Sequence, residues 1–357
     1  FKSTSVNISY LTGKTLPKEK KVIQENLLNG KINFLIGTHA VFQKTIIYKN
    51  LGMAIIDEQH KFGVKQRIQL SKKGGSNCDI LLMSATPIPR TLVMAVYGDM
   101  DVSKIVEKPL YRKEIITLSK PEQKLNEILL FIKKQINYGN QIFWVCPLIK
   151  ESKKLDYSAA VKQYKLLSQE FHNKVGLLHG KLNKDEKNEV LNKFLEKKIN
   201  ILVSTTIIEV GIDFPNANVI VIENANKFGL SQLHQLRGRV GRGLKQATCI
   251  LLYKNNLSEN ARKRIKILKS SNDGFFIADE DMKLRGFGDI LGYKQSGLKD
   301  FKIADPVRHE DLFDIAEKNI MTINENKSNF KNYELLMKLF DKADIINDLD
   351  KKVINSE

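Results

Sequence analysis

Cysteine is scarce in this chain of 357 residues, which contains only three cysteines, one tryptophan and eight prolines. Cys78, Cys146 and Cys249 lie too far apart in the sequence for a paired metal-binding motif or a disulfide framework. Lone cysteines are typical of small core side chains in a reducing compartment, so we expect a cytoplasmic protein. Long apolar runs are also lacking, because no stretch approaches the roughly 18 residues of a membrane helix. We therefore expect no membrane segment.

The usual beginning of a protein is missing too. The first residues, Phe1 to Thr4, contain no initiator methionine and none of the regions of a secretory signal peptide. We expect the sequence to start inside a longer protein. A length of 357 residues is enough for two or three domains, each with its own core.

Acidic residues are in the minority: 58 Lys and Arg against 40 Asp and Glu leave a formal net charge of +18. A field of this size attracts polyanions such as nucleic acid. The alternative explanation is compositional, because lysine is plentiful all along the chain. Arginine is more informative, since three of only ten arginines, Arg237, Arg239 and Arg242, fall within six residues. A general bias towards lysine does not produce that cluster.

Short apolar runs alternate with helical patterns, which is typical of a parallel sheet covered by helices. Runs in the first part of the chain predict strands at Val6–Leu11, Ile32–Ile36, Met53–Ile56 and Ile80–Met83. From Asp101 to Lys120 the pattern loosens, and we expect a linker there. It begins again with an amphipathic helix from Leu125 to Ile136. Further strands are predicted at Ile142–Cys146, Val175–Leu178, Ile201–Ser204, Val219–Ile222 and Thr248–Leu252. The sequence therefore predicts an α/β fold with two tandem parallel-sheet lobes.

The predicted strands stop after about Leu257. A basic helix from Ala261 to Lys269 leads into a glycine-punctuated stretch, Gly274 to Gly297, for which we expect helical pieces joined by tight turns. The tail from Asp305 has a helical pattern of mixed charge. We expect three domains, with the first lobe at 1–108, the second lobe at 109–268 and a helical region at 269–357.

Two carboxylates follow one of the predicted strands, in the segment Ile55-Ile56-Asp57-Glu58-Gln59-His60. The carboxyl end of a strand lies at the mouth of an open α/β sheet, where ligands bind. Asp57 could hold Mg²⁺ directly or through water, and Glu58 could orient and deprotonate an attacking water. The alternative is that the two acids only form a turn or cap a helix, as acids at strand ends often do.

Hydroxyl groups follow two other predicted strands. Ser84 and Thr86 come after the fourth strand, and on their own they would suit a helix cap. Thr205 and Thr206 come after a strand of the second lobe and could contact a nucleic-acid phosphate. Asp213, further along the same segment, could meet a ribose or the partner lobe. Taken alone, this segment could be any junction between a strand and a loop.

The segment Gln235–Arg242, with the sequence QLRGRVGR, is the most specific pattern. Phosphoryl transfer places negative charge on the γ-phosphate oxygens, and an arginine offers several donors in one plane to receive it. We expect Arg239 and Arg242, three residues apart, on one side of a helix, from which both can point into a cleft. Gly238 and Gly241 are poor helix formers, so close backbone approach explains them better. A solvated basic surface is the alternative.

The order of these segments resembles that of superfamily 2 helicases, in which a nucleotide lies between two RecA-like lobes. The acids, the first hydroxyl pair, the threonine segment and the arginines follow one another, each after an apolar strand. Longer segments resemble the RecG family: GTHA at 37–40, LGMAIIDEQHKFGV at 51–64, ATPIPRTL at 85–92 and GLSQLH at 229–234. Residues 272–297 resemble the helical-hairpin translocation motif, which RecG shares with the transcription-repair coupling translocase. The resemblance covers nearly all of residues 5–320.

This resemblance implies an ATP-driven, monomeric motor on branched double-stranded DNA that reverses stalled forks and migrates Holliday junctions. It implies ATP and Mg²⁺ as cofactors, with Asp57 as the metal ligand. The residues expected to be catalytic are Asp57, Glu58, Arg239 and Arg242. Those expected to couple hydrolysis to movement are Gln59, His60, Ser84, Thr86, Gln235, Arg285 and Gln295. Expected at the nucleotide are Gly211 and Asp213, and at the DNA Thr38, His39, Thr205 and Thr206.

A Walker A sequence is lacking. Leu11-Thr12-Gly13-Lys14-Thr15 has the end of one, but Ile8 stands where the first glycine is needed. We expect the phosphate loop and the family's DNA-splitting wedge domain to precede Phe1, so that this chain alone hydrolyses ATP negligibly. Two alternatives stay open, a transcription-repair coupling translocase and a nonenzymatic DNA-binding remnant of a helicase. The intact acids and arginines argue against the remnant, because a mere DNA-binding module needs none of them.

Overall fold

The computed structural model describes residues 5–58, 73–74, 78–84, 101–107, 109, 112–147, 153–205, 214–285, 312, 315–316 and 319, with the backbone alone at 153–158 and 285. The chain divides into two compact units. The larger unit, residues 1–89 and 104–297, contains the elements discussed below. The smaller unit, residues 90–103 and 298–357, lies mostly outside the described residues. Among the described helices, none combines the length and the apolar composition needed to cross a membrane.

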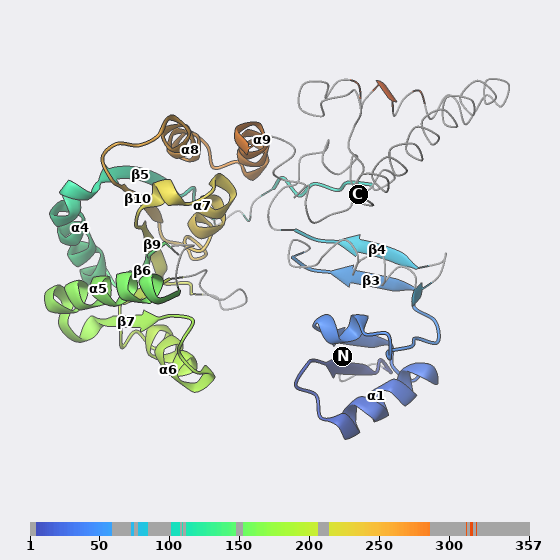
Figure 1. Ribbon diagram of the computed structural model, residues 1–357. Helices are drawn as coiled ribbons and strands as arrows, with labels where there is room; N and C mark the ends of the chain where they lie inside the picture. The colour runs from blue at the N-terminus through green and yellow to red at the C-terminus, as the bar shows by residue number, and fades with distance from the viewer. Residues whose placement is uncertain are drawn as a thin grey trace, which may run out of the picture. The chain divides into compact units, whose positions relative to one another are not determined.

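A pair of parallel strands opens the chain (Figure 1). β1 (Ile8–Leu11) pairs with β2 (Phe34–Gly37), and α1 (Pro17–Leu28) connects them. Pro17 occupies the first turn of α1, where a backbone N–H would have no partner within the helix. A short helical turn, η1 (His39–Phe42), follows β2. The core of this part consists of Leu11, Leu27, Ala40 and Ile46.

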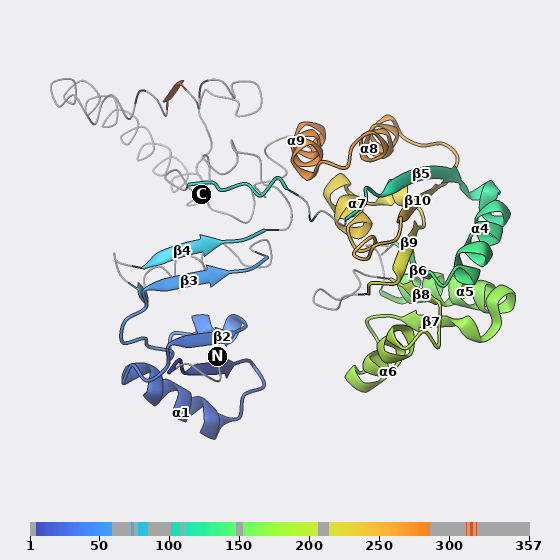
Figure 2. The same cartoon turned by 180° about the vertical axis from the view of Figure 1, so that it is seen from behind.

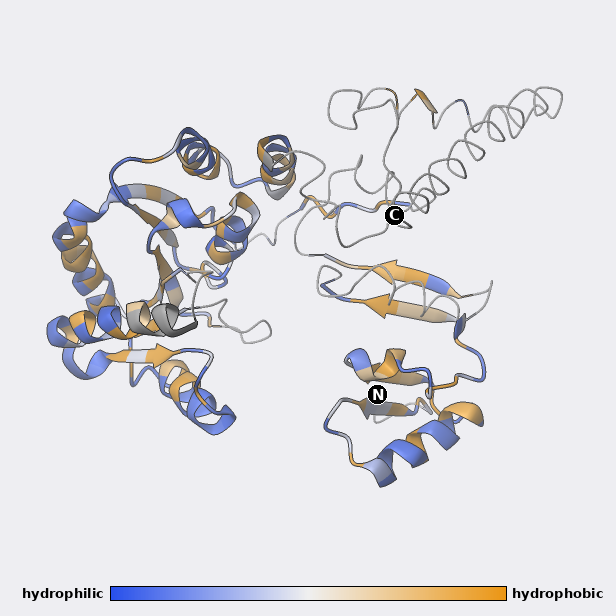
Figure 3. Ribbon diagram, in the orientation of Figure 1, coloured by the Kyte–Doolittle hydropathy of each residue, from blue (hydrophilic) through white to orange (hydrophobic). Residues whose placement is uncertain are grey.

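The next two strands, β3 (Met53–Ile56) and β4 (Asp79–Leu82), also pair in parallel. Burial alternates along β3: Ala54 and Ile56 are buried, whereas Met53 and Ile55 are 51% and 57% exposed. Figure 3 shows both strands as mostly hydrophobic. Parallel strands are usually covered on both faces. Among the described residues, one apolar face of this pair has no cover.

The second lobe is built on a six-stranded parallel sheet with the order β5-β10-β9-β6-β8-β7 (Figures 1 and 2). Its strands are β5 (Ile116–Pro121), β6 (Gln141–Val145), β7 (Val175–Leu178), β8 (Ile201–Ser204), β9 (Ala217–Ile222) and β10 (Thr248–Tyr253). The described helices of this lobe and beyond it are α4 (Leu125–Asn137), α5 (Lys153–Phe171), α6 (Lys184–Leu195), α7 (Leu230–Arg237), α8 (Glu259–Ser270) and α9 (Gly274–Arg285).

The sheet is covered on both faces, and the sequence reflects this. β6, β8 and β9 are buried at every residue, which favours apolar runs over an alternating pattern. Along β6, Phe143 and Val145 belong to one core cluster, while Ile142 and Trp144 belong to the other. Side chains alternate between the faces of a sheet, so the two clusters lie on opposite faces. The apolar stripe of α4 packs into the second of them through Ile128, Ile132 and Ile136.

The expected linker from Asp101 to Lys120 is wrong at its end, because it overlaps β5. This strand pairs with β10 in parallel, with Ile116 opposite Thr248. β5 forms one edge of the sheet, where Ile116 and Leu118 are 49% and 39% exposed. Polar residues alternate with these apolar ones, since only part of an edge strand is buried. The short, broken apolar pattern therefore resembled a loop.

The other predicted strands are confirmed to within two residues at each end. The amphipathic helix is confirmed as α4 and the basic helix as α8. α9 confirms that the glycine-punctuated stretch begins with a helix. The rest of the predicted hairpin and the helical tail lie outside the described residues, apart from four isolated positions. The domain boundaries at 108 and 268 stay predictions.

Candidate nucleotide and DNA site

Asp57 and Glu58 lie directly after β3, at its carboxyl end. Asp57 is exposed, and its Oδ1 accepts a hydrogen bond of 2.8 Å from the main-chain N–H of Glu58. Glu58 is half-buried and has a φ of +50°, a left-handed conformation that costs a residue with a Cβ about 1–3 kcal/mol. Backbone strain of this kind concentrates at functional sites. The conformation of Glu58 therefore supports a functional interpretation of the acidic pair.

Ser84 lies at the same edge of the strand pair as Glu58. β3 and β4 pair with Ile56 opposite Leu82, and Glu58 and Ser84 each follow two residues later. The parallel register thus brings an acid and a hydroxyl from the two predicted motifs to one edge. Three further residues expected here lie outside the described residues: Gln59, His60 and Thr86.

The metal-binding capacity of this edge rests on Asp57. Among the described residues, no group of three or more His, Cys, Asp or Glu side chains can hold a metal ion. Mg²⁺ at a nucleotide needs less, because it keeps several waters and phosphate oxygens and takes one or two carboxylates. The exposed carboxylate of Asp57, at the carboxyl end of a strand, fits that requirement.

Thr38 and His39 follow the carboxyl end of β2, and both are exposed. The N–H of Thr38 donates to the carbonyl oxygen of Leu11 at 3.2 Å, which continues the pairing of β1 and β2 by one residue. Thr38 precedes η1, and the ring of His39 lies 6.3 Å from the ring of Phe42. The two predicted DNA-contacting residues are therefore adjacent to a strand end and accessible.

The arginine segment begins in α7, but the helix ends at Arg237, before Arg239 and Arg242. The expectation that both arginines lie on one helix is therefore wrong. They lie in the loop that joins α7 to β10. Gly238 closes the helix, and Gly241, further along the loop, has a φ of +73°, a left-handed conformation that glycine adopts readily.

Two glycines give this loop its close packing. A Cβ on Gly241 would approach the Cβ of Ala247 to 3.0 Å. A Cβ on Gly243 would approach the carbonyl oxygen of Pro215 to 2.5 Å, closer than real Cβ atoms come. Close backbone approach, which the sequence predicted for the glycines of the segment, is confirmed for Gly241. Gly238 has only ordinary contacts and serves as the helix end.

Arg239 and Arg242 are both half-buried. Burial lowers the pKa of the Arg239 guanidinium, and the neighbouring positive charge of Arg242 lowers it further. Both effects disfavour the charged form of Arg239. An anion bound beside these residues would favour the charged form and counteract both effects. The pair therefore has the electrostatic character of an anion site.

Arg237 differs from its two neighbours, because it is buried and 2% exposed. Its Nη1 donates to the carbonyl oxygens of Leu268 at 2.7 Å and Ser271 at 2.8 Å, and to Oγ1 of Thr117 at 3.3 Å. Its Nη2 donates to Nδ1 of His234 at 3.0 Å. Burial lowers its pKa, and these bonds compensate for the lost hydration. Sequence reasoning counted Arg237 in the arginine cluster without giving it a role of its own, and so missed this internal role.

A second contact attaches α7 to its surroundings. The hydroxyl of Ser231, in the first turn of α7, donates to Oδ2 of Asp281 in α9. Asp281 is 5% exposed. Nothing in the sequence connects two residues that lie fifty positions apart, so this pair was missed as well. Gln235, the coupling residue expected in α7, is half-buried between these two attachments.

The remaining predicted residues are only partly placed. Thr205 is buried directly after β8. Arg285 is the last residue of α9, and its side chain is not among those described. Four more predicted residues lie outside the described residues: Thr206, Gly211, Asp213 and Gln295.

Three family models match the chain. A DEAD/DEAH box helicase model matches residues 1–95, and a helicase conserved C-terminal domain model matches residues 121–243. A third model, described as ATP-dependent DNA helicase RecG, domain 3, C-terminal, matches residues 271–355.

Curated relatives resemble the chain closely. It is 48% identical over 325 residues to the ATP-dependent DNA helicase RecG of Thermotoga maritima and 46% identical over 321 residues to that of Bacillus subtilis. These matches cover 90% and 89% of this chain, but 41% and 47% of the two relatives. The chain thus spans less than half the length of either relative.

Solved structures give the same result. The structure of RecG bound to a three-way DNA junction is 46% identical, with a TM-score of 0.64, and the match covers 87% of this chain and 40% of that one. Dbp5 of S. cerevisiae, bound to RNA and ADP BeF3, is 18% identical with a TM-score of 0.53, covering 80% of this chain and 74% of that one. At that identity, Dbp5 shows the fold alone.

The first two models fall on the two successive parallel-sheet parts of the chain, which places it among the superfamily 2 helicases. The third model is specific to RecG, and the identity to RecG proteins extends over about 90% of the chain. The chain belongs to the RecG family.

Proposed function

We propose that the chain is the motor part of an ATP-dependent helicase that remodels branched DNA, reversing stalled forks and migrating Holliday junctions. The observation that supports this best is the double attachment of α7, which ends at the arginine loop. Ser231 ties α7 to α9, and Arg237 ties it to the end of α8. α9 lies in the region matched by the RecG-specific model. A movement of the arginine loop would therefore reach that region through side-chain contacts.

In this proposal, the hydrolytic residues act from the strand end and the arginine loop. Glu58 orients the attacking water and takes its proton, and Arg239 and Arg242 donate to the γ-phosphate oxygens as their charge grows. Asp57 holds Mg²⁺, which would neutralise phosphate charge when bound. Gly211 and Asp213 are assigned to the nucleotide. Half-burial of the arginines favours this role, because preorganised donors act more strongly where water is partly excluded.

The remaining predicted residues are assigned to DNA and to coupling. Thr38 and His39 are exposed at the end of β2, where a phosphate can reach them. The other proposed DNA contacts are Thr205 and Thr206. The proposed coupling residues are Gln59, His60, Ser84, Thr86, Gln235, Arg285 and Gln295. We further propose that the motor works in the cytoplasm as a monomer.

The chain covers 41% and 47% of the two RecG relatives from Thermotoga maritima and Bacillus subtilis. We propose that the remaining length of such relatives supplies the phosphate-binding loop. This chain alone should then hydrolyse ATP negligibly, and robust hydrolysis by it would contradict that expectation.

The experiment that tests the proposed function compares ATP hydrolysis with forked and with linear duplex DNA at matched salt. It uses a protein that carries this chain together with the remaining length of its relatives. Stronger stimulation by the fork would support branch remodelling. Equal stimulation by both DNAs would overturn it and favour a general duplex translocase, such as one that couples transcription to repair.

A further inference from the structure

A groove of about 960 Å³ lies on the second lobe, away from the arginine loop. It is lined by the end of β5, by the end of β10 with the loop that follows it, and by one side of α8. Figure 1 shows these three elements side by side. The arginine loop precedes the first residue of β10, whereas the groove begins at its last residue. β10 has six residues, a length of about 20 Å, so the two places are distinct.

The charge of the groove is of one sign. Four cations line it, namely Lys254, Arg262, Lys266 and Lys269, and no aspartate or glutamate does. All four side chains are exposed, and none has a carboxylate of the described residues within ion-pair distance. The rest of the lining consists of uncharged hydrogen-bonding groups, among them Ser119 and Asn255, and of the apolar side chains of Leu257 and Ile265.

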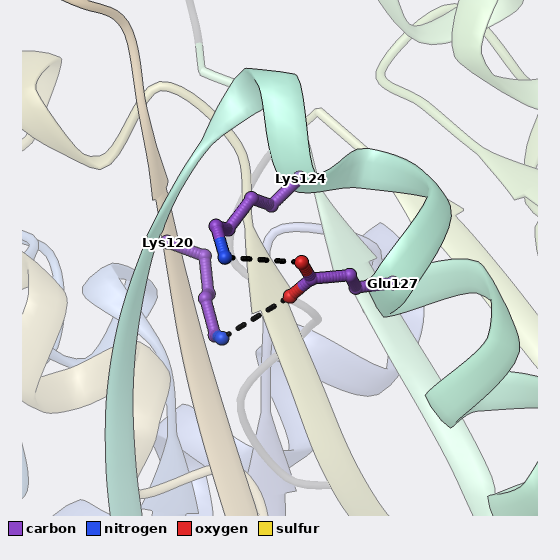
Figure 4. Close-up of polar contacts among 3 residues, drawn as sticks. All are labelled: Lys120, Lys124 and Glu127. Carbon is purple, nitrogen blue, oxygen red and sulfur yellow. Dashed lines mark hydrogen bonds and ion pairs between the residues drawn. The ribbon is translucent and has the colours of Figure 1, made fainter.

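Neighbouring lysines outside the groove are paired, which makes the difference informative. Lys120 and Lys124 contact the two carboxylate oxygens of Glu127 at 3.3 and 3.0 Å (Figure 4). On α8 itself, Lys263 contacts Glu259 at 2.7 Å. Lysine is common everywhere in this chain, but the lysines near the groove usually have an acidic partner. The four cations that line the groove have no such partner among the described residues.

Three of the cations form a row on α8. Arg262, Lys266 and Lys269 follow the spacing i, i+4 and i+7, so they lie along one side of the helix. Their span of seven residues is about 10.5 Å along the axis. One DNA strand carries a phosphate about every 3.4 Å along the duplex axis, so the row matches roughly three phosphates. Like charges at this spacing destabilise a helix by about 0.2–0.5 kcal/mol per pair, which a bound polyanion would offset.

The geometry points to a second nucleic-acid contact: the groove binds the sugar–phosphate backbone of duplex DNA. The cations contact successive phosphates, and Ser119 and Asn255 donate to phosphate or sugar oxygens. Contacts of this kind position the protein on DNA without reading its sequence. The choice of DNA as the polyanion rests on the proposed function. The groove itself lies outside the predicted nucleotide, DNA and coupling residues.

The test measures binding of this chain to a short labelled linear duplex, without nucleotide, between about 50 and 200 mM salt. The groove variant replaces Arg262, Lys266 and Lys269 by Gln. The control variant loses the same charge from exposed helix positions elsewhere on the lobe, through Lys133→Gln, Lys162→Gln and Lys165→Gln. Three lost phosphate contacts should lower the slope of log K against log salt by about 2–3 in the groove variant. The control should keep the slope of the unchanged chain.

Equal losses of DNA binding in the two variants would overturn the groove as a site, because binding would then depend only on the net positive charge of the chain. A groove variant that loses binding to polyglutamate as strongly as to DNA would overturn the assignment to nucleic acid. Lys254→Glu tests the groove without changing α8, because Lys254 lies in the loop that follows β10. It should weaken DNA binding more than Lys162→Glu. Nucleotide is absent, so this result is independent of ATP hydrolysis. A failure of fork stimulation would therefore not contradict DNA binding by the groove. A failure of DNA binding by the groove would not contradict fork stimulation.

Discussion

The guanidinium of Arg237 donates a hydrogen bond of 2.7 Å to the carbonyl oxygen of Leu268, in the last turn of α8. The last four carbonyls of a helix have no partner within the helix, and a cation near them also interacts favourably with the helix dipole. The same nitrogen reaches the carbonyl oxygen of Ser271 at 2.8 Å. One side chain of α7 therefore closes the end of α8 and holds the turn that leads into α9.

Arg237→Met should destabilise the lobe by about 2–4 kcal/mol, because it leaves at least two carbonyl groups without donors in a buried place. The free energy of unfolding in urea measures this loss. Lys162→Met removes a cation from the exposed side of α5 and should change the same quantity by no more than about 0.5 kcal/mol. Equal small effects of the two substitutions would mean that the bonds of Arg237 contribute nothing.

The Ser231–Asp281 contact predicts coupling between α7 and α9. Ser231→Ala, Asp281→Ala and the double variant form a thermodynamic cycle, whose interaction free energy should be about 1–2 kcal/mol. In a protein with the full length of its relatives, both single variants should keep most DNA-stimulated ATP hydrolysis and lose more of the DNA movement per ATP. A purely structural contact would lower hydrolysis and movement together.

The sequence predicts the second lobe well for a physical reason. β6, β8 and β9 are buried on both faces, so each contains a run of at least three apolar residues that stands out from its surroundings. β5 escaped prediction because an edge strand is only partly buried, and its alternating polar residues resemble those of a loop. A strand in which polar and apolar residues alternate at a sheet edge is therefore harder to predict than one with an unbroken apolar run, such as β3.

For the candidate site, the sequence alone could not separate the roles of similar residues. Three arginines within six residues look alike in sequence, and the structure separates them by their neighbours. Arg237 meets Leu268 and Ser271, more than thirty residues later, whereas Arg239 and Arg242 lie in a loop beyond the helix end. A pattern of residue types predicts which chemistry is present. It does not contain the long-range contacts that decide which arginine faces an anion and which one holds helices together.

His179, directly after β7, makes stability depend on pH. Its Nδ1 accepts a hydrogen bond of 3.2 Å from the N–H of Lys181, and burial, together with the charges of Lys181 and Lys187, lowers its pKa. The unfolded chain therefore binds a proton at His179 more readily than the folded chain does. The stabilisation of the fold by neutral His179 is present above the unfolded pKa of about 6.5 and is lost as the pH falls. The free energy of unfolding should decrease between about pH 7.5 and pH 5.5.

The variant His179→Asn should lose that part of the pH dependence. Urea unfolding at both pH values measures it, and His172→Asn controls for the loss of one imidazole. If His179→Asn and the unchanged chain respond identically to pH, the proton is not linked to folding at this residue.

Glu58→Gln and Arg242→Ala test the proposed chemistry in a protein with the full length of the relatives. Glu58→Gln keeps a polar side chain of the same size but cannot take a proton, so ATP binding should persist and turnover should stop. Arg242→Ala should slow hydrolysis by about 10³-fold, the scale of an arginine that stabilises a transferring phosphoryl group. A change of only a few-fold in either rate, measured under saturating DNA, would remove that residue from the catalytic set.

Gly241 offers a test of the arginine loop itself, with Gly139 as a matched control. Both have positive φ values, +73° and +74°, but a Cβ on Gly139 would meet nothing within 4 Å, whereas one on Gly241 would crowd Ala247 at 3.0 Å. Alanine at either position lowers the free energy of unfolding by about 1 kcal/mol or somewhat more, because a residue with a Cβ is strained in the left-handed conformation. Only Gly241→Ala also requires a small shift of Ala247 or of the loop backbone between Arg239 and Arg242.

Both alanine variants should therefore lose a similar part of their stability from backbone strain, with an additional loss for Gly241→Ala. ATP hydrolysis separates them further: Gly139→Ala should keep the rate of the unchanged protein, and Gly241→Ala should lower it by at least about tenfold, since small displacements of positioned groups are costly in catalysis. Thermal unfolding measures the loss of stability, and DNA-stimulated ATP hydrolysis of the same preparations measures the loss of activity. Normal hydrolysis by a folded Gly241→Ala protein would show that the position of the loop arginines tolerates this displacement, and that their proposed alignment with phosphate is wrong.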